Sequence, residues 1–239
     1  MSRKIEVCLT PALLGLYDLK NSIVVVIDIL RATSSMVYGI DNGATAIIPV
    51  AQVEDCLAYA EHGYLLAAER NGEVVAGYNF GNSPFSYTAE RVAGKTVVLT
   101  TTNGTKALHM ARATAAQVVI GSFLNLQALC DWLKVQSQDV LLLCAGWKDS
   151  ANLEDTLFAG AVVKELRAEF TEFDDSSVIA EDLYGLAEND LGAYMNKSSH
   201  SHRLAALNIG EDVKFCLQLN ICQAIPVLVG DALVPLKKD

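Results

Sequence analysis

The sequence lacks the features of a membrane, secreted or nucleic-acid-binding protein. No apolar run reaches the roughly 18–20 residues of a membrane-spanning helix. The start, MSRKIEVCLT, has too short an apolar run before Pro11 for a signal peptide. The net charge is −10, from 18 basic and 28 acidic residues, and no basic stripe is present. Because nucleic-acid binding needs clustered Lys and Arg, we expect neither a nucleic acid nor a membrane as partner.

Several metal-binding and phosphatase signatures are also missing. The six cysteines include no C-x-x-C pair, which excludes zinc-finger spacing, and we interpret them as reduced, mostly buried thiols of a cytoplasmic protein. A cysteine phosphatase needs C-x5-R, but Ser150 stands where an Arg would follow Cys144. An aspartyl-phosphate enzyme needs D-x-D, but Leu30 follows Asp28 at that spacing. For a phosphatase, metal-assisted attack by water is therefore the simplest mechanism.

Three apolar segments carry the signal for the fold. SIVVVID, TVVLTTT and DVLLLCAG are continuous apolar runs, each followed by small polar residues and a helical pattern. Continuous runs indicate strands buried on both faces, as in a parallel sheet covered by helices. The pattern predicts further strands at 4–9, 45–50, 65–68, 117–120 and 225–229, and helices at 33–41, 52–62, 104–113, 124–135, 153–168, 176–188, 200–207 and 211–218.

This alternation predicts an α/β fold with layers in the order α/β/α and a largely parallel or mixed sheet. We expect one domain over residues 1–239, with a helical excursion near 170–220. Because ligands bind at the carboxyl ends of strands in open parallel sheets, the loops after the strands are the candidate site. These loops are 28–34, 100–105 and 144–155, with Glu69, Arg70 and Asn71 after a further short strand.

Two of these loops suit a metal and a phosphate. Asp28 directly follows an apolar strand, and a carboxylate there is costly unless it is paired, hydrogen-bonded or bound to metal. The alternative is a pair with Arg31 or a helix cap. The loop TTTNGT at 100–105 offers hydroxyls, a Gly and a helix start to an anion. Its alternative is an ordinary Thr or Asn cap.

Other side chains have competing interpretations. Arg31 and Arg70 suit a phosphate or sulfonate, but each alone is more simply a partner in a structural salt bridge. Glu154 could ligate metal, or it could interact favourably with the dipole of the helix that it opens. Asp155 could instead form a capping box with Asn152. His200 could contact an anion or donate a proton, and surface exposure is its alternative.

Seven segments occur in a fixed order: VVVIDILRATSS, AAERNG, NFGNSP, LTTTNGT, IGSFLN, CAGWKDSANLEDTLFAG and SSHSHRLAAL. Together they resemble the successive motifs of the 2-phosphosulfolactate phosphatase (ComB) family and cover nearly the whole chain. The resemblance implies Mg²⁺-dependent hydrolysis of a small acidic phosphate ester, 2-phospho-3-sulfolactate, to sulfolactate and phosphate. In methanogens this step serves coenzyme M synthesis. The positions that match the family pattern are Asp28, Arg31, Glu69, Arg70, Asn82, Thr101, Asn103, Gly104, Glu154, Asp155 and His200.

These positions give a hypothesis for the site. Mg²⁺ would be held by Asp28, with Glu154 or Asp155 as a further ligand. Arg31 or Arg70 would neutralise the transferred group, and the remaining arginine with His200 would hold the carboxylate or sulfonate. Glu69 and Asn82 are placed with the substrate-binding residues. The phosphate would be cradled by Thr101, Thr102, Asn103, Gly104 and Thr105.

The chain departs from the family pattern at two places. His200 is followed by Ser201 rather than Gly, and Asn220 stands near a position where the family often has Asp. These departures keep two alternatives open: a phosphatase for another phosphorylated carboxylic acid, and a non-catalytic anion-binding protein. A homodimer is compatible with the class of protein, but no segment locates an interface.

Overall fold

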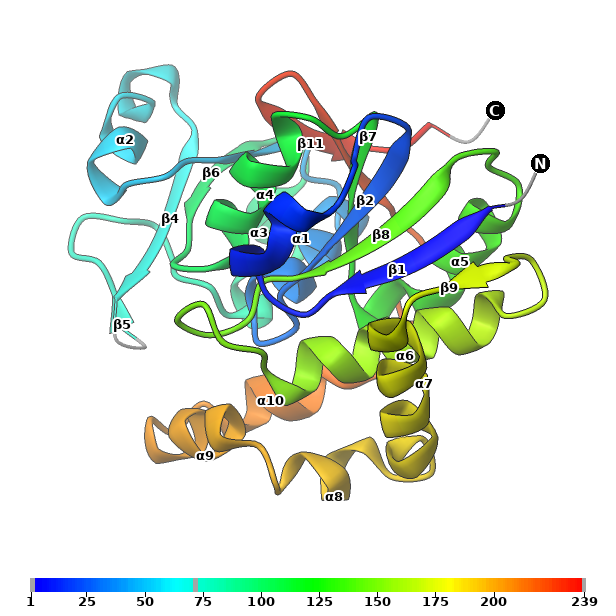
Figure 1. Ribbon diagram of the computed structural model, residues 1–239. Helices are drawn as coiled ribbons and strands as arrows, with labels where there is room; N and C mark the ends of the chain where they lie inside the picture. Colours follow the sequence, from blue (N-terminus) through cyan, green and yellow to red (C-terminus); the bar gives the residue numbers. More distant parts are fainter. Residues whose placement is uncertain (1–2, 71–72, 238–239) are drawn as a thin grey trace.

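The computed structural model describes residues 3–70 and 73–237, apart from the side chain of Arg70. Within them, eleven strands form a mixed sheet in the order β5-β4-β6-β3-β11-β10-β7-β2-β8-β1-β9, which confirms the expected layered α/β class (Figure 1). The strands are β1 (Lys4–Cys8), β2 (Ser22–Ile27), β3 (Ala46–Pro49), β4 (Leu65–Arg70), β5 (Glu73–Val74), β6 (Thr96–Thr100), β7 (Gln117–Gly121), β8 (Asp139–Cys144), β9 (Glu172–Phe173), β10 (Pro226–Val229) and β11 (Ala232–Pro235).

Helices connect most of these strands. The expected helix at 52–62 is divided into α2 and a 3-10 turn, and the short α3 and α8 were not predicted. The helices are α1 (Ala32–Asp41), α2 (Val53–Leu57), α3 (Ala89–Val92), α4 (Gly104–Arg112), α5 (Leu126–Lys134), α6 (Leu153–Leu166), α7 (Asp175–Ala187), α8 (Leu191–Met195), α9 (Ser199–Ala206) and α10 (Gly210–Cys216), with 3-10 turns η1 (Pro11–Leu16), η2 (Ala60–His62), η3 (Pro84–Ser86) and η4 (Phe123–Asn125).

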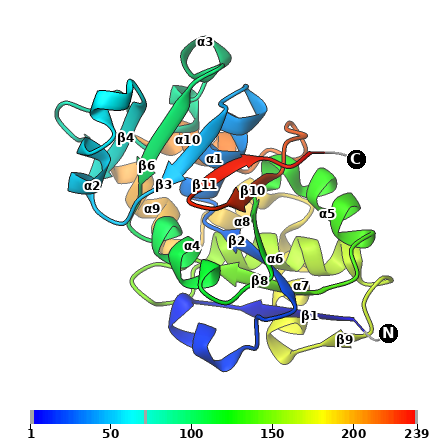
Figure 2. The ribbon, with the colours of Figure 1, turned by 90° about the horizontal axis from the view of Figure 1, so that it is seen from above.

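Apart from β5, which pairs antiparallel with β4, the sheet consists of two parallel blocks joined by an antiparallel hairpin. One block is β7-β2-β8-β1-β9 and the other is β3-β6-β4. Between them lies the hairpin β10–β11, which is antiparallel to both β7 and β3 (Figure 2). Going from β7 through β10 and β11 to β3, each pairing is antiparallel, so the strand direction reverses three times. The strands of the two blocks therefore run in opposite directions.

The central strands are buried on both faces, as their continuous apolar sequences predicted. In β2, Ile23, Val25 and Ile27 pack in one core with residues of α5, α6 and α7. Val24 and Val26 face the opposite core, with residues of α1 and α4. Helices α6 to α10 lie below the sheet in the view of Figure 1. Two helical layers therefore cover the parallel block that carries Asp28.

The helical excursion predicted near 170–220 is present as α7 to α10. It is attached to the sheet by the unpredicted strand β9, which pairs with β1. The Asp174 carboxylate strengthens this attachment, because it accepts the N–H of Val7 at 3.2 Å and the N–H of Ser177 at 2.8 Å. None of the helices in the described residues combines the length and the apolar character that crossing a membrane requires.

Candidate functional site

The loops that follow β2, β6 and β8 meet at one polar pocket of about 130 Å³, which also contains residues from β4 and α9. This confirms that strand-end loops converge, although β6 belongs to the block that runs in the opposite sense. Predicted site residues form most of the lining. Those that line it are Asp28, Arg31, Glu69, Asn82, Thr101, Thr102, Asn103 and His200.

Asp28 lines this pocket and is only 8% exposed. Burial raises the pKa of its carboxyl group to about 6, against the lowering effect of His200 and of two backbone N–H groups. Those N–H groups belong to Ala32 and Gly104, the first residues of α1 and α4. Two helix N-termini therefore face one carboxylate, an arrangement that favours its charged form.

The loop before α4 keeps polar groups available to a ligand. Its helix start is capped from within, because Thr101 Oγ1 accepts the N–H of Thr105 at 3.1 Å. Asn103, at the N-cap position, makes no side-chain capping bond. Thr102 and Asn103 line the pocket together with Thr101. Of the Thr or Asn cap expected as the alternative, the Thr cap is present through Thr101 and the Asn cap is not, so the Thr102 hydroxyl and the Asn103 amide remain at the pocket.

Arg31 lies in the pocket but already has two anionic partners. Its guanidinium group forms ion pairs with Glu69 and Asp212, and its side chain is 4% exposed. Glu69 also accepts the N–H of Asn82 at 3.3 Å. The salt-bridge alternative for Arg31 is therefore the arrangement observed, with Asp212 as a partner that the sequence did not indicate. The predicted role of Arg70 concerns a side chain outside the described part of the structure.

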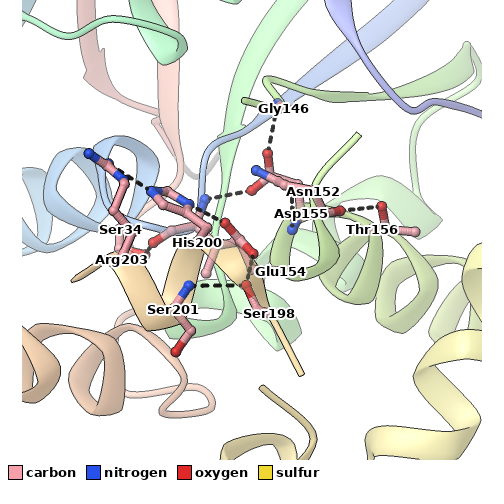
Figure 3. Close-up of polar contacts among 11 residues, drawn as sticks. Ser34, Gly146, Asn152, Glu154, Asp155, Thr156, Ser198, His200, Ser201 and Arg203 are labelled. Atoms are coloured by element: carbon pink, nitrogen blue, oxygen red, sulfur yellow. Dashed lines mark hydrogen bonds and ion pairs between the residues drawn. The ribbon is translucent and has the colours of Figure 1, made fainter. Parts of the chain in front are cut away.

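His200 and Glu154 form a buried pair (Figure 3). Both lie close enough to Asp28 to affect the pKa of its carboxyl group. His200 Nδ1 lies 2.5 Å from Glu154 Oε1, and the Ser198 hydroxyl donates to the other Glu154 oxygen at 3.2 Å. On its other side, His200 Nε2 lies 3.2 Å from Nη2 of Arg203. Because Arg203 can only donate, this contact assigns Nε2 as an acceptor and the proton to Nδ1. His200 is buried rather than exposed.

Asp155 connects two of the pocket loops from behind. Its oxygens accept the N–H of Ile29 at 2.9 Å and the N–H of Gly146 at 3.1 Å. Its own N–H donates to Asn152 at the start of α6, but the reciprocal bond of the predicted capping box is not made, because both Asp155 oxygens accept from Ile29 and Gly146. Burial, with Asp28 and Glu154 nearby, raises the pKa of the Asp155 carboxyl group well above its usual range. Asp155 therefore fixes the loops after β2 and β8 relative to each other.

The three carboxylates predicted to bind metal differ in their surroundings. Asp28 lines the pocket, whereas Glu154 and Asp155 are fully buried and hydrogen-bonded through both oxygens. Among the described residues, no group of three or more His, Cys, Asp or Glu side chains could hold a metal ion. Mg²⁺ is commonly bound by one or two carboxylates together with water and phosphate oxygens. Asp28 fits that mode, and a ligand role for the other two stays a prediction.

Comparison with known proteins connects this pocket with a family. The model of the 2-phosphosulpholactate phosphatase family matches residues 8–231. The chain belongs to this family. A probable 2-phosphosulfolactate phosphatase of Thermotoga maritima is 40% identical to this chain, and the match covers 88% of this chain and 90% of the relative's length. A protein with the same name from Caldanaerobacter subterraneus subsp. tengcongensis is 39% identical, over 88% of this chain and 89% of its own length. Another from Synechocystis sp. is 38% identical, over 86% of this chain and 88% of its own length.

The two departures from the pattern of the 2-phosphosulfolactate phosphatase family lie outside the pocket. Ser201 is in α9, where its N–H donates to Ser198 Oγ at 3.1 Å. Asn220 has a φ of 61°, donates its N–H to the Phe123 carbonyl at 3.0 Å and accepts the N–H of Gln127 at 2.7 Å. Both residues serve the local backbone, and neither contributes to the lining of the pocket.

Two family-motif residues that were not singled out also line the pocket, Trp147 and Arg203. The Trp147 ring stacks on His200 with centroids 5.2 Å apart, and the Arg203 guanidinium carbon lies 4.2 Å from the centroid of the Trp147 ring. One sequence signal could have found Arg203. It lies three residues after His200, a spacing that places both side chains on the same face of a helix.

Proposed function

We propose that this protein is a Mg²⁺-dependent phosphatase that hydrolyses 2-phospho-3-sulfolactate to 3-sulfolactate and phosphate. The observation that carries the proposal is the convergence of residues from six family motifs on one small polar pocket. Relatives that match most of the chain are named probable 2-phosphosulfolactate phosphatases. A cytoplasmic location is part of the proposal, supported by six cysteines that are all buried as free thiols.

The phosphate group would bind where the loop 101–103 precedes α4. Thr101, Thr102 and Asn103 all line the pocket at this point. The N-terminus of α4 adds the positive end of a helix dipole, which favours an anion, although the N–H groups of Gly104 and Thr105 already donate to Asp28 and Thr101. The loop therefore offers donors to the oxygens of a phosphoryl group. Phosphoryl transfer depends mainly on such positioning and on stabilisation of charge.

Asp28 would hold the Mg²⁺ ion, which when bound polarises the phosphoryl oxygens and the attacking water. Because the pKa of Asp28 is about 6, its carboxyl group is mostly ionised at neutral pH and is ready to bind a cation. Arg31 contributes N–H groups in a fixed position, since Glu69 and Asp212 hold its guanidinium group and balance its charge. Asp28 and Arg31 would therefore orient the ion and the phosphoryl group.

His200 is the group positioned to move a proton. Glu154 accepts the Nδ1 proton, and Nε2 faces the side where Arg203 and the pocket lie. Hydrolysis forms a bond between phosphorus and the water oxygen and breaks the bond to the sulfolactate oxygen, which must gain a proton. The imidazole can accept or release that proton at Nε2 once the N–H of Arg203, which donates to this atom, turns away from it.

The proposal is tested by phosphate release from 2-phosphosulfolactate, with 2-phospholactate, phosphoglycolate and p-nitrophenyl phosphate in parallel, each with Mg²⁺ and with EDTA. We expect Mg²⁺-dependent release that is fastest from 2-phosphosulfolactate. Faster release from another ester would change the substrate, and no release from any ester would favour an anion-binding protein without turnover.

The variant Asp28→Asn tests the metal assignment in the same assay. It should lose about 100-fold or more in kcat/KM, because it removes the carboxylate proposed to bind the ion. The matched control is Asp231→Asn, which changes a carboxylate that is 73% exposed and outside the pocket. Full activity of Asp28→Asn with unchanged Mg²⁺ dependence would show that Asp28 is not the ligand.

A further inference from the structure

One side of the pocket is formed by a stack of three side chains that the mechanism above does not fully use. The Trp147 ring contacts His200 with centroids 5.2 Å apart and carries the Arg203 guanidinium carbon 4.2 Å from its centroid. Arg203 Nη2 donates to His200 Nε2 at 3.2 Å (Figure 3). Arg203 is thus held in a defined orientation by a ring face and by one hydrogen bond.

Arg203 also has a donor without a partner. Its Nε atom is buried and makes no hydrogen bond with any described residue. Buried donors are normally satisfied, so an orphaned guanidinium N–H at a pocket is suited to an acceptor supplied by a ligand. The pocket's other buried orphan is Asn82 Oδ1, an acceptor, which cannot bind an oxyanion.

The charges in the pocket lead to the same residue. The lining described by the structure contains two arginines, and Arg31 is already neutralised by Glu69 and Asp212. Arg203 forms no ion pair with a described carboxylate. A substrate that carries an anionic group in addition to its phosphate must place that group near a positive charge. Arg203 is the described lining residue that can offer one.

We propose that Arg203, held against Trp147, binds the non-phosphate anionic group of the substrate, a carboxylate or a sulfonate, and thereby selects multiply charged phosphate esters. This rests on the proposed function, because the phosphate would occupy the opposite group of donors at 101–103. An arginine fork matches the oxygens of either anion in two parallel hydrogen bonds. The alternative is that Arg203 only orients His200, which would affect every ester equally.

The test compares kcat/KM for three esters with the same branched phosphate: 2-phosphosulfolactate, 2-phospholactate and isopropyl phosphate. The second lacks the sulfonate, and the third also has a methyl group in place of the carboxylate. The proteins are the full-length wild type, Arg203→Gln, Arg203→Lys and the control Arg112→Gln. Arg112 is 43% exposed and lies outside the pocket, where it pairs with Asp231.

We expect Arg203→Gln to reduce one selectivity ratio by about ten- to hundredfold, the range for a hydrogen bond to a charged group. If the preference for 2-phosphosulfolactate over 2-phospholactate is lost, Arg203 binds the sulfonate. If the preference for 2-phospholactate over isopropyl phosphate is lost, Arg203 binds the carboxylate. Arg203→Lys keeps the charge and should recover part of the ratio, whereas Arg112→Gln should leave both ratios unchanged. An equal loss for all three esters, or unchanged ratios in both Arg203 variants, overturns the proposal.

A binding measurement separates this proposal from the proposed function. Sulfolactate has both anionic groups and no phosphate, so its affinity by titration calorimetry requires no turnover. We expect the wild type and Arg112→Gln to bind it with equal affinity and Arg203→Gln to bind about tenfold or more weakly. If the wild type released no phosphate from any ester, the proposed function would fail, and this measurement would still decide the subsite. Equal affinity in Arg203→Gln, or no binding by the wild type, overturns the subsite.

Discussion

Replacing Gly104 by Ala tests whether the start of α4 must remain without a side chain. A Cβ atom built on Gly104 would lie 2.8 Å from both Asp28 Oδ2 and the Cβ of Ala32, and 3.3 Å from Thr101 Oγ1. All three neighbours are buried, so none can move freely into solvent. Gly104 has a helical backbone conformation, which Ala also adopts. Steric contact is therefore the source of the expected cost.

The magnitude follows from the size of the required shift. Contacts of 2.8 Å must open by several tenths of an ångström to become ordinary van der Waals contacts. Overpacking of this kind costs about 1–3 kcal/mol, while Ala gains up to about 1 kcal/mol over Gly in a helix. We expect a net loss of about 1–2 kcal/mol in the free energy of unfolding. Activity should fall by about tenfold to 100-fold, because the shift displaces Asp28 from its position in the pocket.

The assay combines urea unfolding with Mg²⁺-dependent kcat/KM for 2-phosphosulfolactate. The matched control is Gly185→Ala in α7, because Gly185 is exposed and its added Cβ would meet no atom within 4 Å. The control should be stabilised by about 0.5–1 kcal/mol through helix propensity and should keep full activity. A Gly104→Ala protein with wild-type stability and wild-type rate would refute the reasoning.

Four further predictions concern Asp28 and the contacts of α7. Because the pKa of Asp28 is about 6, kcat/KM should fall as pH drops through 6, and a flat rate profile there would contradict this. Without metal, in EDTA, the raised pKa means that protonated Asp28 stabilises the folded state below about pH 4, and this stabilisation is lost as pH rises through 6. The urea midpoint of Asp28→Asn should therefore decline less than that of the wild type between about pH 4 and 6. Gly160→Ala should cost more than about 3 kcal/mol, measured by thermal unfolding, because its Cβ would lie 1.9 Å from the Ala180 carbonyl oxygen. Asp174→Ala should lower the free energy of unfolding by about 1–3 kcal/mol in urea, since it removes the acceptor for N–H groups of β1 and α7; an unchanged midpoint would argue against that contact.

The central strands could be predicted because their sequences need no information from elsewhere in the chain. Segment 23–27 is apolar at every position, and a strand covered on both faces buries all five of its side chains. Strand β9 could not be predicted this way. It has two residues, and it forms because the edge of β1 offers hydrogen-bonding partners to Glu172 and Phe173.

Strand β11 shows a signal that was present but not used. Gly230 and Asp231 lie between the apolar segments 226–229 and 232–235, and Gly230 has a φ of 61°. A two-residue loop with glycine between two apolar runs is typical of a hairpin. This hairpin has a large effect on the topology, because it reverses the direction of the β3-β6-β4 block relative to β2.

For the site, the sequence indicated which loops meet but not which partners the side chains choose. Asp28 and the loop 101–103 were expected together because both follow strands, and they do share one pocket. The pair between Arg31 and Asp212 joins residues 181 positions apart, and no local pattern predicts it. The buried contact of Glu154 with His200 is likewise a product of tertiary structure.

The arrangement of charges suggests why this site would need both a cation and an arginine. Asp28 lies in the pocket that would receive a multiply charged anion, and Arg31 has its charge balanced by Glu69 and Asp212. An ionised Asp28 would therefore repel the substrate, and burial already makes that charged form costly. A divalent cation on Asp28 would reverse the local charge, and the substrate's phosphate oxygens could complete the coordination of that cation. Arg203 would supply positive charge at the other group of donors. On this reasoning, metal and substrate bind together rather than independently.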